Sequence, residues 1–206
     1  MRQLIVFTLL FSFIGFSIAG ELPDFSGKWR VNPNLSDDVK EIFKQHIKVK
    51  KRSLGSGQKK DGGGLLFGSG KQRSQQLRKL VRKIPPELLK ANFVVVQQTA
   101  DTIHFDYLYT SRTIRTDGRS NPILLSTDDA GARDVVTGVW DQGSFEVEIV
   151  SALGAHVEEI WQRVPAEGNL ATGEKQIEVV YTLDMPLYLE QKAKFRRVFD
   201  WVGQAD

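Results

Sequence analysis

The 206-residue sequence contains no cysteine. This absence excludes disulfide bonds, a lipid-attachment cysteine, a cysteine nucleophile and thiolate metal sites. The chain has only three histidines, and no serine has the Gly-x-Ser-x-Gly surroundings of a nucleophile elbow. We therefore expect no catalytic residue, no metal site and no cofactor. A protein that is not an enzyme is the favoured interpretation.

The few histidines leave one alternative open. His104 and Asp106 project from the same face of one expected strand, and His156 and Glu158 do so on another. If these strands were neighbours, the four side chains would form a metal or acid–base cluster. Asp106 and Glu158 stand opposite apolar rows, however, and such positions usually face solvent. We interpret them as surface residues.

The first residues have the pattern of an export signal. Arg2 precedes the apolar run Leu4–Ile18, and Ser17 and Ala19 are small residues at a cleavage site. The apolar run is roughly 15 residues, shorter than the ~20 of a membrane-spanning helix, which leaves a retained anchor as the alternative. We expect residues 1–19 to be a signal peptide. An exported chain without cysteine is typical of a bacterial periplasm.

Positive charge is concentrated in one part of the chain. The segment Lys44–Lys90 contains 14 Lys and Arg residues but only Asp61 and Glu87, whereas the net charge of the whole chain is +3. The remainder is therefore acidic. Residues 20–206 have the length of a single domain, within which this basic segment needs its own explanation.

Two helices are expected within or beside the basic segment. The first follows Ser36 or Asp38, either of which is a suitable N-cap, and places apolar side chains on one face. Glycines alternate with Ser, Lys and Gln over about 48–74, and such a composition favours a flexible insertion. A second helix is expected over Gln75–Ile84, and prolines follow it.

The second helix is basic on one side, where Arg78, Lys79, Arg82 and Lys83 lie. Three interpretations stay open. The segment is a solvated linker, it contacts anionic lipid or another envelope component, or it binds nucleic acid. Export and the lack of an aromatic stacking surface argue against nucleic acid.

From Asn92 onward the hydrophobic pattern alternates with a period of two residues. With the strand around Trp29, the segments number about eight to ten antiparallel strands in sequential order, and such meanders close into barrels. We predict a mainly β, up-and-down antiparallel barrel with two helices inserted after the first strand. The apolar rows of the later strands include Ile103, Phe105 and Tyr107; Phe145, Val147 and Ile149; Ile177, Val179, Tyr181 and Leu183; and Phe195, Arg197, Phe199 and Trp201.

Three motifs in order carry a resemblance to a known family. They are Phe25-Ser26-Gly27-Lys28-Trp29, Asp117-Gly118-Arg119 and Arg197-Val198-Phe199-Asp200. The chain resembles a lipocalin-like family of exported bacterial β-barrels of unassigned function, with Phe199 where that group often has Tyr. The resemblance implies a lipocalin-like barrel in which the first and last strands are neighbours.

The resemblance also implies a structural role for Gly27, Trp29 and Arg197. In lipocalins the tryptophan of the Gly-x-Trp motif closes one end of the barrel, and an arginine of the last strand lies over its ring. We therefore expect Arg197 to stack on Trp29 through a cation–π contact. These residues are interpreted as barrel closure and not as a functional site.

A barrel of this size is either filled by side chains or holds one small ligand. Aromatic side chains with polar atoms suit such a ligand site, and the residues we expect to line it are Tyr107, Trp140, Phe145 and Tyr181. The favoured function is non-catalytic binding of a small apolar or amphipathic molecule in the bacterial envelope. The alternatives are an envelope-associated interaction protein that uses residues 44–90 on anionic surfaces and, less favoured, an enzyme on the same barrel.

Overall fold

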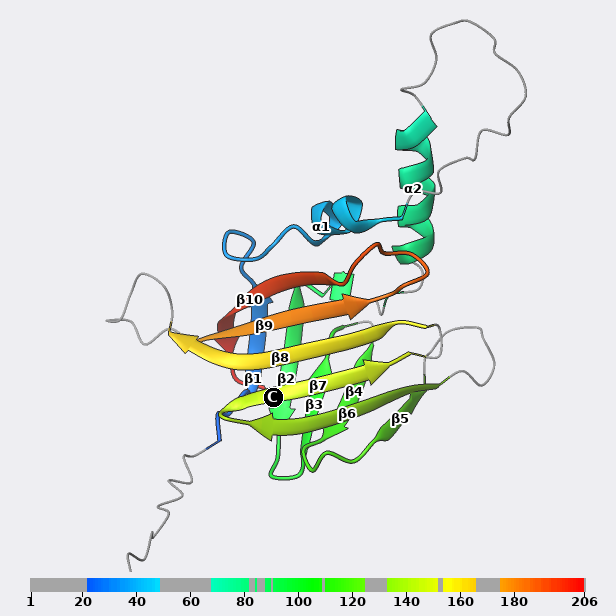
Figure 1. The fold of residues 1–206 in the computed structure, drawn as a ribbon. Coiled ribbons are helices and arrows are strands. Elements are labelled where there is room, and N and C mark those ends of the chain that lie inside the picture. The colour runs from blue at the N-terminus through cyan, green and yellow to red at the C-terminus, as the bar shows by residue number, and fades with distance from the viewer. Residues whose placement is uncertain are drawn as a thin grey trace, which may run out of the picture.

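The computed structural model is a mainly β protein in which a long antiparallel sheet curves into a nearly closed barrel (Figure 1). It describes residues 22–48, 68–81, 84, 88–89, 91–108, 110–124, 133–151, 154–165 and 175–205. The expected signal peptide, residues 1–19, and residues 49–67 of the basic insertion lie outside these ranges. Within them, the predicted fold class is confirmed.

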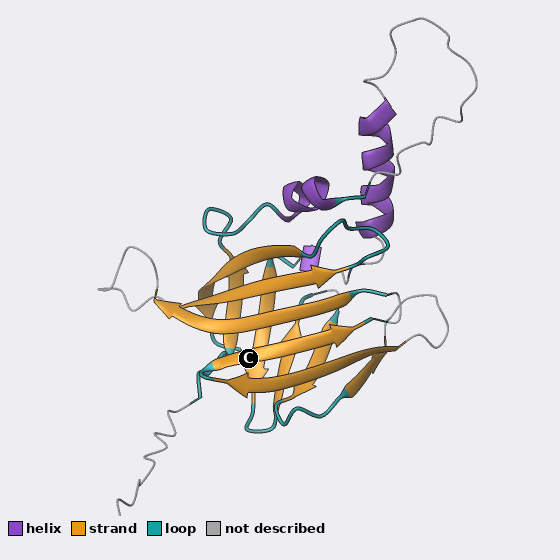
Figure 2. Ribbon diagram, viewed as in Figure 1, coloured by secondary structure: helices purple, strands orange, loops and turns teal. Residues whose placement is uncertain are grey.

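The elements follow one another in the predicted order. The strands are β1 (Gly27–Val31), β2 (Phe93–Gln98), β3 (Thr102–Asp106), β4 (Ser111–Arg115), β5 (Asn121–Leu124), β6 (Arg133–Asp141), β7 (Ser144–Val150), β8 (His156–Pro165), β9 (Lys175–Asp184) and β10 (Ala193–Gly203). The helices α1 (Val39–His46) and α2 (Gly68–Val81) are inserted between β1 and β2 and lie together at one end of the barrel (Figure 2).

The helix starts were predicted with unequal success. Asp38 caps α1, and its carboxylate accepts hydrogen bonds from the Lys40 and Glu41 amides at 3.0 and 3.2 Å. The second helix begins at Gly68, earlier than the expected start at Gln75. Glycines weigh against helix in a sequence pattern, but they cost less in the first turn than in a helix interior. Neither helix in the described part of the chain has the length and apolar character that crossing a membrane requires.

The sheet has the order β4-β3-β2-β1-β10-β9-β8-β7-β6-β5, and every pair of neighbours is antiparallel. Because β1 pairs with both β2 and β10, the first and last strands are neighbours, as the resemblance implied. Trp29 lies opposite Trp201, and Val31 lies opposite Phe199. All pairs except β1–β10 join strands consecutive in sequence, which is the up-and-down meander that the period-two pattern predicted.

The two edge strands, β4 and β5, meet at a seam that the sheet leaves without regular pairing. Here the Asp-Gly-Arg turn reaches across to β6: the Gly118 amide donates to the Gly138 carbonyl at 3.0 Å, and Asp117 forms an isolated bridge with Val139. Gly118 has a positive φ of 75°, which glycine adopts without strain. At Gly138 the approach to β4 is so close that a Cβ would lie 2.5 Å from Ile114 Cγ2.

One end of the barrel is closed by the segment before β1. The Trp29 indole is fully buried, and its Nε1 donates to the Phe25 carbonyl at 2.8 Å. The Phe25 amide in turn donates to Gln98 Oε1 at 3.0 Å, which attaches this segment to β2. Gly27 has a φ of 143°, and a side chain there would collide with the Trp201 ring. The opening motif therefore packs closely against β2 and β10, and its role as barrel closure stays a prediction.

The opposite end is covered by α1. Phe43 is buried and meets the Phe195 ring edge to face, with centroids 5.8 Å apart. Ile47 forms a bridge with Leu189 in the loop before β10, and the Glu190 amide donates to the His46 carbonyl at 2.8 Å. The amphipathic pattern of the helix thus places its apolar face over the barrel opening.

The close approach at the seam predicts that Gly138 tolerates no side chain. In Gly138→Ala the new Cβ would also lie 2.5 Å from Phe145 Cζ and 2.8 Å from the Arg115 carbonyl. We expect the free energy of unfolding, measured by urea titration, to fall by about 1–3 kcal/mol. Val139→Thr, at the neighbouring exposed position, should stay close to wild type. Wild-type stability of Gly138→Ala would contradict the observed packing of β4 on β6.

The turn at the seam predicts an acid-sensitive contribution to stability. A hydrogen bond from Arg115 lowers the pKa of Asp117 to about 2. Because this pKa is below that of the unfolded chain, the contribution is complete above about pH 4 and is lost as the pH falls toward 2. Asp117→Asn should therefore lower the Tm more at about pH 5 than at about pH 2.

Thermal unfolding followed by circular dichroism measures this difference. Asp141→Asn, which removes the same charge at the turn between β6 and β7, provides the matched control. The same Tm difference between wild type and Asp117→Asn at both pH values would contradict the prediction.

Candidate functional site

An ion pair crosses the interior of the barrel. Arg112 projects from β4 and Glu159 from β8, and their exposed fractions are only 5% and 0%. Nη1 of Arg112 donates to Oε1 of Glu159 at 2.9 Å, and Nη2 donates to Oε2. Since β4 and β8 are not neighbours in the sheet, this two-pronged interaction joins separate parts of the barrel wall.

Two aromatic side chains extend the ion pair into a polar cluster of four residues. Tyr107, directly after β3, accepts a hydrogen bond from Arg112 Nη2 at 2.9 Å. Trp161, two residues after Glu159 on the same face of β8, donates from Nε1 to Glu159 Oε2 at 2.9 Å. Both aromatic residues are buried. We call Tyr107, Arg112, Glu159 and Trp161 the interior cluster.

Aromatic rings surround the interior cluster. The guanidinium of Arg112 lies 5.2 Å from the Phe105 ring centroid and 5.5 Å from that of Tyr107. Phe105 packs on Trp161 with centroids 4.6 Å apart, and Trp161 stacks with Phe199 at 6.3 Å. A guanidinium over aromatic faces gains cation–π attraction, which is stronger where water is excluded.

The arrangement is suited to hydrogen bonding. A two-pronged Arg–carboxylate pair has fixed geometry, and its charges interact strongly in a low-dielectric interior. The interior cluster is therefore a set of oriented polar atoms surrounded by aromatic rings.

Of the four residues expected to line a ligand site, Trp140 and Phe145 contact each other. Tyr107 belongs to the interior cluster. Trp140 contacts Phe145 with centroids 5.2 Å apart, and Tyr181 stacks on Phe195 at 5.0 Å. Phe145 and Tyr181 are buried, while Trp140 is partly buried. Their role in lining a ligand cavity stays a prediction.

The arginine over the Trp29 ring comes from a different strand than the resemblance implied. The guanidinium of Arg163, on β8, lies 4.9 Å from the Trp29 ring centroid. Burial lowers the pKa of Arg163. Arg197 is also buried, but its Nη1 donates to the Ala91 carbonyl at 2.8 Å and its guanidinium lies 6.0 Å from the Phe199 ring. Arg163 thus makes a cation–π contact with Trp29, and the role of Arg197 in barrel closure stays a prediction.

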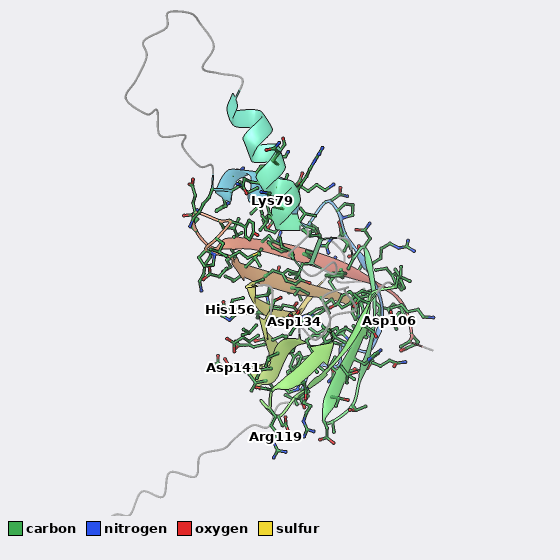
Figure 3. All side chains as sticks on the ribbon, turned by 90° about the vertical axis from the view of Figure 1, so that its right-hand side faces the viewer. Lys79, Asp106, Arg119, Asp134, Asp141 and His156 are labelled. Atoms are coloured by element: carbon green, nitrogen blue, oxygen red, sulfur yellow. The ribbon has the colours of Figure 1, made fainter. Side chains whose placement is uncertain are left out.

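The basic residues of the second helix are only partly described. Arg78 and Lys79 are exposed on α2, whereas Leu80 is fully buried. Lys79 lies beyond one end of the barrel, away from the interior (Figure 3). Arg82 and Lys83 lie outside the described residues. Contact of this helix with an anionic surface stays a prediction.

The alternative histidine–carboxylate cluster is not formed. His104 Nδ1 is 2.8 Å from Thr113 Oγ1, and His156 Nε2 is 2.8 Å from Glu148 Oε1. Asp106 and His156 lie on opposite flanks of the barrel (Figure 3), and β3 and β8 are not neighbours in the sheet. Nowhere in the described ranges do three His, Asp or Glu side chains gather closely enough to hold a metal ion.

The sequence prediction missed Arg112 and Glu159. The signal for Glu159 is its position between Val157 and Trp161, since residues two apart in a strand face the same side. Arg112 has the same relation to buried Ile114 on β4. A charged residue in an apolar row therefore marks a buried charge, but the row does not reveal its partner.

Comparisons with known proteins assign no family to the chain. No protein-family model matches it, and no curated protein sequence matches it. Solved structures that resemble it include apo lipid binding protein 8 of Caenorhabditis elegans (13% identity, TM-score 0.44, 86% of this chain and 95% of that chain covered).

A structure described as the REP1-NXSQ fatty acid transporter has 13% identity, a TM-score of 0.43 and coverage of 87% and 97%. Human cRBP IV has 10% identity, a TM-score of 0.34 and coverage of 87% and 99%. Coverage is extensive, but identity and TM-score are both low, so the function of this chain has to be argued from its own residues.

Proposed function

We propose that the barrel binds a small apolar or amphipathic molecule in its interior, without catalysis, and that the interior cluster contacts the polar end of that molecule. The observation that carries the proposal is the convergence of Tyr107, Arg112 and Glu159 within an aromatic enclosure. A few oriented polar groups among apolar and aromatic side chains are characteristic of small-molecule sites.

The energetics of the ion pair favour a role in recognition. Moving two charges out of water costs several kcal/mol for each ion, and well-packed apolar residues usually stabilise a core as much or more. The surrounding interior consists of large apolar side chains such as Phe105, Phe199 and Val179. A charged pair in such surroundings supplies polarity and orientation that an apolar core lacks.

The apolar remainder of the molecule would contact the aromatic rows. Phe199 stacks on Trp161 of the interior cluster, and this contact places aromatic surface next to the polar atoms. We further propose that the protein acts in a bacterial envelope. This part of the proposal rests on the sequence pattern of residues 1–19 and on the absence of cysteine.

The buried ion pair leads to a prediction about the stability of a single and a double variant. In Arg112→Met, Glu159 remains buried without its arginine, and the free energy of unfolding should fall by about 3–5 kcal/mol. In the double variant Arg112→Met/Glu159→Leu, both charges are absent and stability should return to within about 1 kcal/mol of wild type or exceed it. Urea unfolding measures both changes. If the double variant is as unstable as the single variant, the loss does not come from an unpaired buried charge, and the prediction is wrong.

A separate prediction concerns the ligand itself. Native mass spectrometry of the full chain purified from its own cells should show a bound lipophilic mass that organic solvent removes. The double variant, purified in the same way, should retain less of it because the polar contacts are absent. No bound mass, together with no binding of added fatty alcohols, esters or acids in calorimetry, would overturn the proposed function.

A further inference from the structure

The proposed function leaves open which polar end the barrel accepts, and the charge balance of its interior bears on this question. We infer that the barrel selects molecules whose polar end is uncharged, such as an alcohol or ester, over molecules that end in a carboxylate. The inference rests on the proposed function. Its basis is that Glu159 already occupies the anion-binding edge of Arg112.

Arg112 alone would be a strong site for a carboxylate. Its two terminal nitrogens match the two oxygens of a carboxylate, and this pairing is the strong form of charge-assisted hydrogen bond. In this barrel both nitrogens donate to Glu159, which is fully buried. The protein thus supplies its own carboxylate where a ligand carboxylate would bind.

The rest of the interior does not offset this arrangement. Among the described residues, the buried charged side chains are Arg112, Asp134, Glu159 and Arg197, two of each sign. Arg197 donates to the Ala91 carbonyl, and Arg163, which is half-buried, lies on the Trp29 ring and donates to the Asp24 carbonyl. The four buried charges among the described residues, with Arg163 left aside, therefore sum to zero.

A carboxylate entering this interior would meet the like charge of Glu159 in a medium of low dielectric constant. Like charges brought together there repel strongly. A hydroxyl or ester group brings no net charge and can exchange hydrogen bonds with the cluster. The cluster therefore favours the uncharged end and disfavours the anion.

Isothermal titration calorimetry on the full chain tests the inference with three probes of equal chain length: 1-decanol, methyl decanoate and sodium decanoate. The titrations are made at a pH well above the pKa of a fatty carboxyl group. For wild type we expect the alcohol and the ester to bind at least about tenfold more tightly than decanoate. Glu159→Gln keeps the shape of the side chain and removes its charge, so decanoate should gain at least about tenfold relative to decanol.

The matched control is Glu158→Gln. The Glu158 side chain faces outward and is partly exposed, and its Oε1 lies 3.6 Å from Lys192 Nζ. It loses the same charge and should keep the wild-type order of affinities. Thermal unfolding gives a second readout: decanoate should raise the Tm of Glu159→Gln more than that of wild type, because its charge no longer meets the charge of Glu159. Circular dichroism verifies that each variant is folded.

The outcomes separate the two proposals. Wild-type binding of decanoate as tight as that of decanol overturns the inference and leaves the proposed function intact. Binding of none of the three probes overturns both. An unchanged preference in folded Glu159→Gln also overturns the inference. If that variant does not fold, the wild-type comparison of the three probes decides the question.

Discussion

The two-pronged interaction between Arg112 and Glu159 fixes how the polar groups of the interior are oriented, because it links β4 to β8 across the barrel. The meander leaves β4 and β5 as edge strands, and regular backbone pairing does not close the sheet between them. Closure at this seam relies on the turn at Gly118, on the close approach at Gly138 and on side chains that cross the interior. A charged residue on β4 therefore has a structural role as well as a chemical one.

The two ends of the barrel are covered by different elements of the chain, and the interior cluster lies between them. At one end the chain before β1 is fixed by hydrogen bonds through Phe25 and Gln98, and the Trp29 ring lies beneath Arg163. At the other end α1 contributes Phe43 as an apolar cover on Phe195. Directional hydrogen bonds contribute at this end as well, since the Glu190 amide donates to the His46 carbonyl at 2.8 Å.

Much of the fold could be predicted because alternation in a half-buried strand is a local property of the sequence. The rows through Phe145 and Ile177 face the interior as predicted, and Asp38 caps α1. Contacts between distant strands were not accessible in this way. The stacking of Arg163 on Trp29, and the pairing of Arg112 with Glu159, depend on barrel radius and strand register, which periodicity does not encode.

The structural and chemical roles of the ion pair are physically connected. Any molecule that exchanges hydrogen bonds with Arg112 or Glu159 acts on the interaction that links β4 to β8. A ligand that preserves the pair adds its binding free energy to the stability of the closed barrel, whereas one that competes for Arg112 also weakens the link. The same repulsion that disfavours an anion at Glu159 therefore protects the link between the two strands. The proposed selectivity for an uncharged polar end and the link between β4 and β8 are in this way two consequences of one buried carboxylate.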